Sequence, residues 1–456
     1  MTFSALDSEL LGPLFATDAM RNVFSDEARV AAMLATEAAL ARAQGGLGIV
    51  PPGLADAIAS VKPTDLDITA LGVGTALAGV PVIPFLKALQ AQLPADLEPH
   101  VHKGATTQDI ADTALVLQMR AGLNLVARDL SLILLGLEQM AERHRATACA
   151  GRTYGQHAAP VTFGFKAAVW AAGIAETAAR LPELRDGGLM PSLGGPVGTL
   201  AGMGEQGPAV LDAFAAELGL QAPPLTWHTR RTPFSEIGAW LAMLLGALAK
   251  FAGDVAHLAS TEVGEVAEPH LSGRGGSSAM PHKRNPVGAT VILACAMAAK
   301  GHAMTLLDAI TAAHERPAGA WHAEWSALPQ LFGLASGALR EARILAEGLV
   351  VDAERMGANL DLTRGLLFAD AVAGRLAGPL GREAAHAAVE RAAERVRGGT
   401  PSLSAALRAD ATLAALPPDL LDTGGDLTKA VVAAGLWIDR ALPFCAGIRA
   451  DLAASG

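Results

Sequence analysis

The stretch Leu123-Asn-Leu-Val-Ala-Arg-Asp-Leu-Ser-Leu-Ile-Leu-Leu-Gly-Leu-Glu-Gln-Met140 decides the fold, and it lies within a proline-free run from Asp109 to Ala159. Around Leu130–Leu137 apolar residues cover nearly the whole helical circumference, which predicts burial on all sides. We expect a helix of about 35 residues, on the order of 50 Å long. The apolar residues recur at the helical spacing of three and four: Leu123, Val126, Leu130, Ile133 or Leu134, Leu137 and Met140.

Two more proline-free runs, Phe234 to Glu268 and Val287 to Arg316, indicate further long helices and therefore a long bundle. A bundle this apolar is more often shared between subunits than exposed. Prolines divide the chain before it, and short helical patterns alternate with loops after about Val350. The sequence predicts an all-α fold in three helical parts, at residues 1–108, 109–350 and 351–456, with the long bundle in the middle.

The composition narrows the class of protein. Hydrophobic residues make up 51% of the 456 residues and aromatic residues 4%, so the interior is filled with small aliphatic side chains. The formal net charge of −10 disfavours nucleic acid as a partner, because phosphate neutralisation needs a basic surface. The three cysteines form no CxxC pair, so neither a metal site nor a disulfide framework is predicted.

The N-terminus and the apolar stretches predict a cytoplasmic protein. Met1 to Ala16 contains acidic residues and no basic ones, unlike a secretory signal. The longest uncharged apolar stretches, near Ile237–Ala249 and Pro286–Ala299, fall short of the ~20 residues that span a bilayer. We interpret them as core helices and expect no membrane partner.

The segment Ser272-Gly-Arg-Gly-Gly-Ser-Ser-Ala-Met-Pro-His-Lys-Arg-Asn-Pro286 is the strongest candidate for a site. Its glycines permit unusual backbone angles, and its serines, Lys283 and Arg284 supply hydroxyls and positive charge. The helix expected after Pro286 would direct free N–H groups toward an anion. A flexible surface loop explains the glycines equally well, but not the order of the residues from Ser277 to Pro286.

That order resembles the signature of the fumarase/aspartase superfamily. The resemblance implies that Ser277 is the catalytic base, with Ser278 beside it, and that Lys283 and Asn285 hold a substrate carboxylate. Proton removal next to a carboxylate builds up a dianion that fixed cations and donors stabilise. A serine can act as the base only where solvent is excluded and a nearby positive charge stabilises its alkoxide.

Two further segments resemble site regions of the same superfamily. In Gly104-Ala-Thr-Thr-Gln-Asp-Ile-Ala-Asp-Thr113, the resemblance implies that Thr106, Thr107 and Gln108 donate hydrogen bonds to the substrate. The segment is also an ordinary helix N-cap, and both interpretations can hold together. Gly151-Arg-Thr-Tyr-Gly-Gln-His-Ala-Ala-Pro160 resembles the region that usually carries the general-acid histidine.

The chain departs from the superfamily at that histidine. Tyr154 stands in its place, His157 follows three residues later, and Thr290 replaces the glutamate that normally pairs with the histidine. Bacterial 3-carboxymuconate cycloisomerases, as a family, also have an aromatic residue there, and the chain resembles that family over nearly its whole length. Its specific matches are Phe24-Ser-Asp26, Trp227-His-Thr229 with Arg231, His314-Glu-Arg316, Trp321-His-Ala-Glu-Trp325 and Asn359-Leu-Asp-Leu-Thr363.

This second resemblance implies that His228, Arg231 and Arg316 contact the substrate and that Tyr154 and His157 belong to the catalytic centre. Considered alone, a single histidine is more often structural than catalytic, and Glu315–Arg316 is compatible with a solvated ion pair.

The two resemblances together imply a tetramer with a shared helical core, in which each active site combines segments of three chains. They also imply that the reaction is a lactone-forming cycloisomerisation that needs no metal or cofactor. The alternatives are another lyase of the superfamily, such as an adenylosuccinate-lyase-like enzyme, a cycloisomerase for another substituted muconate, and a non-enzymatic structural protein on the same scaffold.

Overall fold

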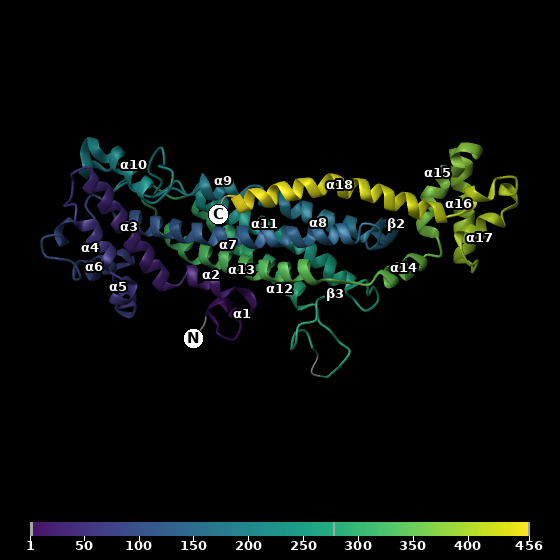
Figure 1. The fold of residues 1–456 in the computed structure, drawn as a ribbon, viewed down its shortest axis with the longest axis horizontal. Helices are drawn as coiled ribbons and strands as arrows, with labels where there is room; N and C mark the ends of the chain where they lie inside the picture. The colour runs from purple at the N-terminus through teal and green to yellow at the C-terminus, as the bar shows by residue number, and fades with distance from the viewer. Residues whose placement is uncertain (1–2, 277–278, 455–456) are drawn as a thin grey trace.

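The computed structural model describes residues 3–276 and 279–454, and it shows an elongated, almost entirely helical chain (Figure 1). The expected all-α architecture is confirmed. Several helices of the N-terminal part gather at one end of the molecule, together with the later helix α10: α3 (Asp26–Gly46), α4 (Leu54–Ser60), α5 (Ile68–Ala78), α6 (Val82–Gln90) and α10 (Gly207–Glu217). The two short helices before them, α1 (Gly12–Phe15) and α2 (Asp18–Val23), lie beside the central bundle instead.

The centre is a bundle of long helices, as the proline-free runs predicted. Its longest member, α7 (Thr107–Arg143), has 37 residues, and its residues from Leu123 to Leu137 contribute many of the side chains of the main hydrophobic core. The other bundle helices are α8 (Phe163–Ala178), α9 (Leu181–Asp186), α11 (Thr232–Leu258), α12 (Val287–Ala309) and α13 (Ala320–Gly348).

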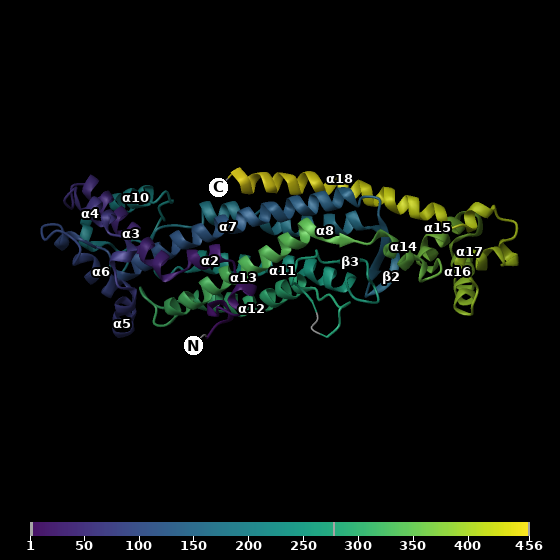
Figure 2. The ribbon, with the colours of Figure 1, turned by 60° about the horizontal axis from the view of Figure 1, so that its bottom comes forward.

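A third group of helices forms the opposite end of the molecule around its own hydrophobic cluster (Figure 1). It contains α15 (Ala369–Leu380), α16 (Arg382–Arg397) and α17 (Leu403–Arg408). The preceding helix α14 (Ala353–Asp361) lies between the bundle and this group, and its Met356 belongs to the main core. The last helix, α18 (Gly424–Ala454), leaves this group and runs back along α7 and α8 (Figure 2), where Ile438 and Cys445 join the central core. The division at residues 108 and 350 stays a prediction, since α18 packs with the central part.

Two small antiparallel hairpins interrupt the helices, and the sequence analysis did not anticipate them. In the first, β1 (Ala148–Thr153) pairs with β2 (Gln156–Thr162) directly after α7. Its two turn residues, Tyr154 and Gly155, have positive φ angles of 50° and 76°. Such angles at both central residues are those of the tight turns that suit a hairpin. The second pairs β3 (Val266–Ala267) with β4 (Val350–Val351).

Short 3-10 helices connect these elements: Ala5–Asp7, Pro63–Asp65, Glu98–His100, Ala201–Gln206, Leu366–Phe368, Ala411–Leu413 and Pro418–Leu421.

Three bundle helices, α11, α12 and α18, are long and apolar enough to cross a membrane by length and composition alone. Only 44%, 39% and 22% of their most apolar windows are buried within the single chain. The expected core helices therefore keep apolar faces that this chain does not cover, including Met297 and Met304 on α12 and Leu436 and Trp437 on α18. Exposed apolar faces of this kind are typical of surfaces that contact another protein or a membrane.

Candidate functional site

The start of α7 is organised around the buried carboxylate of Asp109. This side chain is fully buried and accepts hydrogen bonds from the backbone N–H groups of Thr106 at 2.9 Å, Gly194 at 2.8 Å and Gly195 at 2.9 Å. The carboxylate in the first helical turn also suits the positive end of the helix dipole. Asp109 thus joins the predicted donor segment to the loop at Gly194–Gly195.

His228 is held against the same carboxylate. Its Nε2 lies 2.6 Å from Oδ1 of Asp109, and its ring is 3% exposed. Gln108 donates from Nε2 to the carbonyl of His228 at 2.9 Å and to Asp112 at 3.1 Å. Gln108 is fully buried, so its amide group fixes His228 from within. The other ring nitrogen of His228, Nδ1, has no hydrogen-bond partner among the residues that the structure describes.

Arg231 lies in a fully buried network rather than at an open surface. It donates from Nε to Glu324 at 2.9 Å and from Nη1 and Nη2 to the two carboxylate oxygens of Asp112 at 2.7 and 3.1 Å. Burial lowers the pKa of Arg231, but Asp112 and Glu324 outweigh it and raise the pKa. Trp321 completes the network by donating to Asp112 at 2.8 Å. We therefore assign Arg231 to positioning α7 against α13.

Arg316 lies at the predicted donor segment. Its guanidinium donates to the hydroxyl of Thr106 at 2.8 Å and to the carbonyl of Pro196 at 3.3 Å. Arg316, Thr106 and Thr107 are all partly exposed. This group therefore offers hydroxyls and a positive charge where a small anion can reach them.

A second imidazole–carboxylate pair lies beside this group, and the sequence analysis missed it. His102 has a positive φ of 62°, and its Nδ1 lies 2.7 Å from Glu37, whose carboxylate is 1% exposed. Burial lowers the pKa of His102, but the hydrogen bond and charge of Glu37 and the charge of Asp109 raise it above its ordinary value. A histidine two residues before Gly104 was the only sequence signal, and its partner on α3 is 65 residues away.

Tyr154 and His157 lie on the first hairpin, beyond the other end of α7. Tyr154 is fully exposed at the turn, while His157 on β2 is partly buried. Burial lowers the pKa of His157, and the neighbouring positive charge of Arg152 lowers it further. Arg152 anchors the hairpin through an ion pair with the fully buried Glu265, which also accepts from Asn359 at 2.8 Å.

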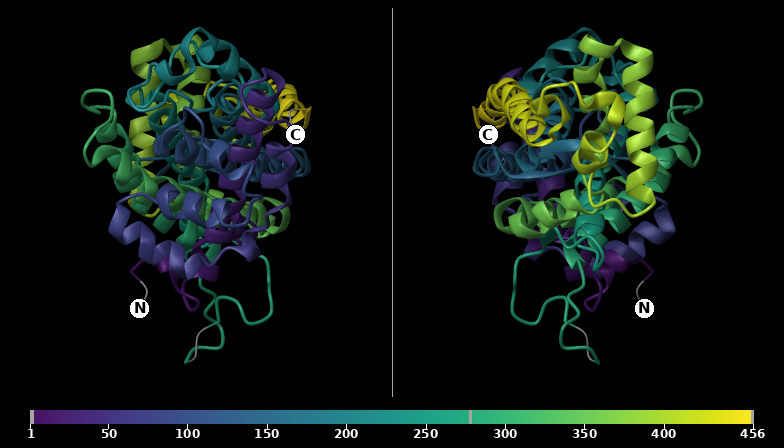
Figure 3. Two further views of the ribbon diagram at one scale, coloured as in Figure 1. Left: turned by 90° about the vertical axis from the view of Figure 1, so that its left-hand side faces the viewer. Right: turned by 90° about the vertical axis from the view of Figure 1, so that its right-hand side faces the viewer.

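The segment before α12 forms a loop that projects from the bundle (Figure 3). Backbone pairing closes its base: Asn285 N–H donates to Gly275 at 2.8 Å, and Gly276 pairs with Arg284. The side chains of Lys283 and Asn285 are exposed. Ser277 and Ser278 lie outside the described residues.

The start of α12 is already capped, which corrects the expectation of an anion site there. Glu268 accepts from the backbone N–H groups of Gly288 at 3.0 Å and Ala289 at 2.8 Å. The chain's own carboxylate thus takes the place predicted for a ligand. Thr290 directs its hydroxyl back to the carbonyl of Pro286 at 2.7 Å.

The structure brings together only part of the predicted site. Thr106, Gln108, His228, Arg231 and Arg316 gather around the start of α7, whereas the hairpin begins beyond its far end. A helix of 37 residues separates them by on the order of 50 Å. Within the described residues, no group of three or more His, Cys, Asp or Glu side chains could hold a metal ion.

Comparisons with known proteins identify close relatives. A family model described as lyase matches residues 15–301. A 3-carboxy-cis,cis-muconate cycloisomerase from Pseudomonas aeruginosa is 45% identical, over 95% of this chain and 96% of its own. A nitrosuccinate lyase from Streptomyces davaonensis is 44% identical, over 89% of this chain and 88% of its own. The crystal structure of 3-carboxy-cis,cis-muconate lactonizing enzyme from Pseudomonas putida superposes with a TM-score of 0.92 at 42% identity, covering 97% of this chain and all of that one.

Proposed function

We propose, from the premise that this chain belongs to the lyase family, that it is an enzyme that converts 3-carboxy-cis,cis-muconate to 4-carboxymuconolactone. In this reaction one carboxylate of the substrate adds to the conjugated diene, and a proton is delivered to the carbon next to another carboxylate. The reverse reaction is a β-elimination in which the leaving group is an internal carboxylate.

The assignment rests on positions 154 and 290. Most members of the superfamily have the general-acid histidine at the first position and the glutamate that pairs with it at the second. Tyr154 is fully exposed at a hairpin turn, and the hydroxyl of Thr290 is bonded to its own helix. A carboxylate is a stable anion and departs without strong acid assistance. Expulsion of an amine or hydroxide does need an acid, and that assistance is typically worth about 10²–10⁴-fold in rate. The missing acid pair is therefore compatible with lactone chemistry.

The roles of Ser277, Ser278, Lys283 and Asn285 follow from the resemblance alone, and those of the other residues follow also from their contacts. Ser277 transfers the proton at carbon, and Lys283 and Asn285 bind the carboxylate whose α-carbon reacts, with Ser278 beside them. Thr106, Thr107 and Arg316 bind a second carboxylate of the substrate. Gln108, His228 and Arg231 have internal partners and hold the start of α7 in place.

The active site is proposed to be shared among subunits of a homotetramer. Two features support this: the ~50 Å between the start of α7 and the hairpin, and the exposed apolar faces of α12 and α18. The exposed Tyr154 would then lie against the α7 segment of another subunit. The same apolar faces would be covered by neighbouring subunits rather than by lipid, in a cytoplasmic enzyme.

A second candidate is elimination from a nitro-substituted succinate, which the relative from Streptomyces davaonensis favours. Its leaving group would also be a stable anion, so the same argument about the missing acid applies.

The test is the loss of ultraviolet absorbance of 3-carboxy-cis,cis-muconate on mixing with purified protein, with nitrosuccinate, adenylosuccinate and unsubstituted muconate in parallel. Rapid turnover of the carboxylated diene alone is the expected result. Turnover of nitrosuccinate alone would replace the first candidate with the second.

A further inference from the structure

Arg29 lines a pocket between α3, α7 and α13. Among the residues that the structure describes, its buried Nε has no hydrogen-bond partner and no ion pair joins its guanidinium to a carboxylate. Asp26, one turn earlier on α3, acts on it only at a distance. Burial lowers the pKa of Arg29, and Asp26 offsets this only in part. An unpaired cation in a partly closed pocket is costly, and an anion there would relieve the cost.

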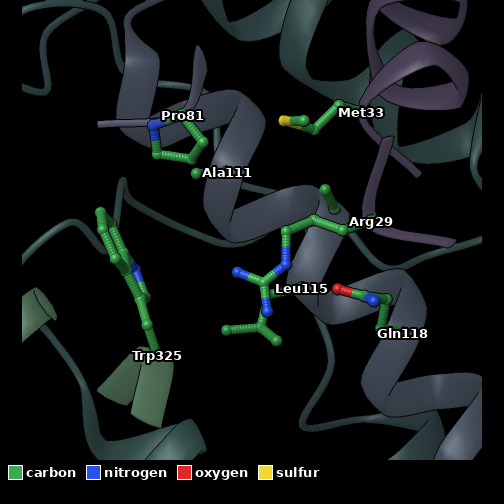
Figure 4. A pocket seen from close by; sticks show the side chains of 8 residues that line it. Arg29, Met33, Pro81, Ala111, Leu115, Gln118 and Trp325 are labelled. Atoms are coloured by element: carbon green, nitrogen blue, oxygen red, sulfur yellow. The ribbon is translucent and has the colours of Figure 1, made fainter. Parts of the chain in front are cut away.

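The opposite wall of this pocket is aromatic. Figure 4 shows the ring of Trp325 across the pocket from the guanidinium of Arg29, with Pro81 and Met33 along one side. Trp325 is fixed by an edge-on contact with Trp321 at 4.9 Å between ring centroids. Stacking of Arg29 on this ring is not seen among the described residues. The narrow space between the two side chains measures only about 10 Å³, roughly the room that one water needs. A flat ligand can therefore reach Arg29 and Trp325 only from a wider cavity that both side chains also line.

A larger cavity continues from the same two side chains. It has a volume of about 410 Å³ and is lined by Arg29, Trp325, Ser25 and Gln330 among others, which is enough for a small organic molecule. Arg21 also lines it but donates to the carbonyl of Leu6 at 3.1 Å.

The charges around the cavity restrict the ligand. Asp7 and Asp26 also line it, so a dianion such as phosphate would meet two carboxylates. Arg21 is held by the carbonyl of Leu6, whereas no side-chain hydrogen bond of Arg29 is seen among the described residues. The guanidinium of Arg29 can bind one carboxylate through two parallel N–H bonds. The buried Gln118 also lines the narrow part of the pocket, and its side-chain oxygen has no hydrogen-bond partner among the described residues.

We propose that the larger cavity, where Arg29 and Trp325 line it, is a binding site for a small monocarboxylate with a planar aromatic or conjugated body. The carboxylate pairs with Arg29, and the flat body lies against Trp325. This site goes beyond the proposed catalytic function, because it contains none of the residues assigned to that reaction.

The test is isothermal titration calorimetry of the full-length protein with benzoate as the probe. Cyclohexanecarboxylate, which is not planar, benzamide, which is uncharged, and inorganic phosphate serve as comparison ligands. Benzoate should bind at least tenfold more tightly than each of the three. Equal binding of benzoate and benzamide would overturn the role of the charge.

Variants locate the binding. Arg29→Gln should lower the affinity for benzoate at least tenfold. Arg29→Lys should lower it less, because lysine keeps the positive charge but lacks the two parallel N–H donors of the guanidinium. Trp325→Leu should abolish the preference for benzoate over cyclohexanecarboxylate. Arg42→Gln, an exposed change on the same helix, is the matched control and should leave benzoate binding unchanged.

Lys283→Ala separates this proposal from the catalytic one. Benzoate bound at Arg29 should keep its affinity in this variant, whereas benzoate bound in the proposed active site should lose it. The site at Arg29 is refuted if benzoate does not bind. This result would be obtained if a side chain of another subunit filled the pocket. The site is equally refuted if folded Arg29→Gln binds benzoate as the unaltered protein does. Turnover of 3-carboxy-cis,cis-muconate is measured independently.

Discussion

Nε2 of His228 lies 2.6 Å from Oδ1 of Asp109, and both side chains are buried at the first turn of α7. The contact joins two segments 119 residues apart in sequence. Because Asp109 also accepts three backbone N–H bonds, it fixes the positions of Thr106 and of the Gly194–Gly195 loop at once. The geometry of the proposed substrate donors therefore depends on a residue that does not itself need to touch substrate.

Asp109→Asn should destabilise the protein and lower turnover together. The amide cannot accept all the bonds that the carboxylate accepts, so the free energy of unfolding should fall by about 3 kcal/mol. Urea denaturation and steady-state kinetics measure the two effects. Asp308→Asn, an exposed change on α12, is the control and should stay within about 0.5 kcal/mol of the unaltered protein. A loss no larger than that of the control would contradict the anchoring role of Asp109.

The pair of His102 and Glu37 should make stability depend on pH. The pKa of His102 is raised in the folded state above its ordinary value of 6.5. Its contribution is therefore fully present below that value and is lost as the pH rises through the folded pKa. The difference in urea midpoint between the unaltered protein and His102→Gln should be larger at about pH 6 than at about pH 9. A difference that is constant or grows with pH would show that His102 is not stabilised as a cation.

Glu265→Gln should disturb the hairpin that carries Tyr154 and His157. The change breaks the buried ion pair with Arg152, which should cost about 3 kcal/mol of stability. Small displacements of a site segment cost up to about 10²-fold in rate, so kcat should fall in protein that is still folded by circular dichroism. Glu262→Gln, an exposed neutralisation three residues earlier, is the control. Normal kcat in folded Glu265→Gln would separate the hairpin from catalysis.

Lys283→Ala should reduce kcat/KM for the carboxylated diene by about 10²-fold, because a fixed cation at the developing dianion is lost. Lys300→Ala removes an exposed charge further along α12 and should leave kcat/KM within twofold, roughly the effect of an unrelated surface change. Equal effects of the two changes would leave Lys283 without a role in substrate capture.

The sequence predicted the parts of the fold that depend on local periodicity. The long α7 was visible in the apolar spacing from Leu123 to Met140. The long helices α13 and α18 were harder to find, because Pro329 and Pro443 lie inside them and proline usually marks a helix end. Tertiary packing holds these helices together despite the lost backbone bonds.

The candidate site was predictable where residues act through a local motif, and less so where a distant partner decides their role. A helix cap at Thr106 or Thr107 follows from the sequence around them, and the structure places it at Thr106. The pairing of Arg231 with Glu324 and of His102 with Glu37 joins residues 93 and 65 positions apart, which no spacing rule shows. For the same reason Glu268 could not be recognised as the cap of α12, 20 residues later.

The measurement that tests the central claim most directly is the rate of absorbance loss of 3-carboxy-cis,cis-muconate with the unaltered protein and with Ser277→Ala, at equal concentration and equal assembly state. We expect rapid loss with the unaltered protein and a decrease on the order of 10²–10⁴-fold with Ser277→Ala, the size typical of losing a proton-transfer group. Loss at the same rate with both proteins would remove Ser277 from the mechanism. No loss with the unaltered protein would contradict the proposed reaction itself.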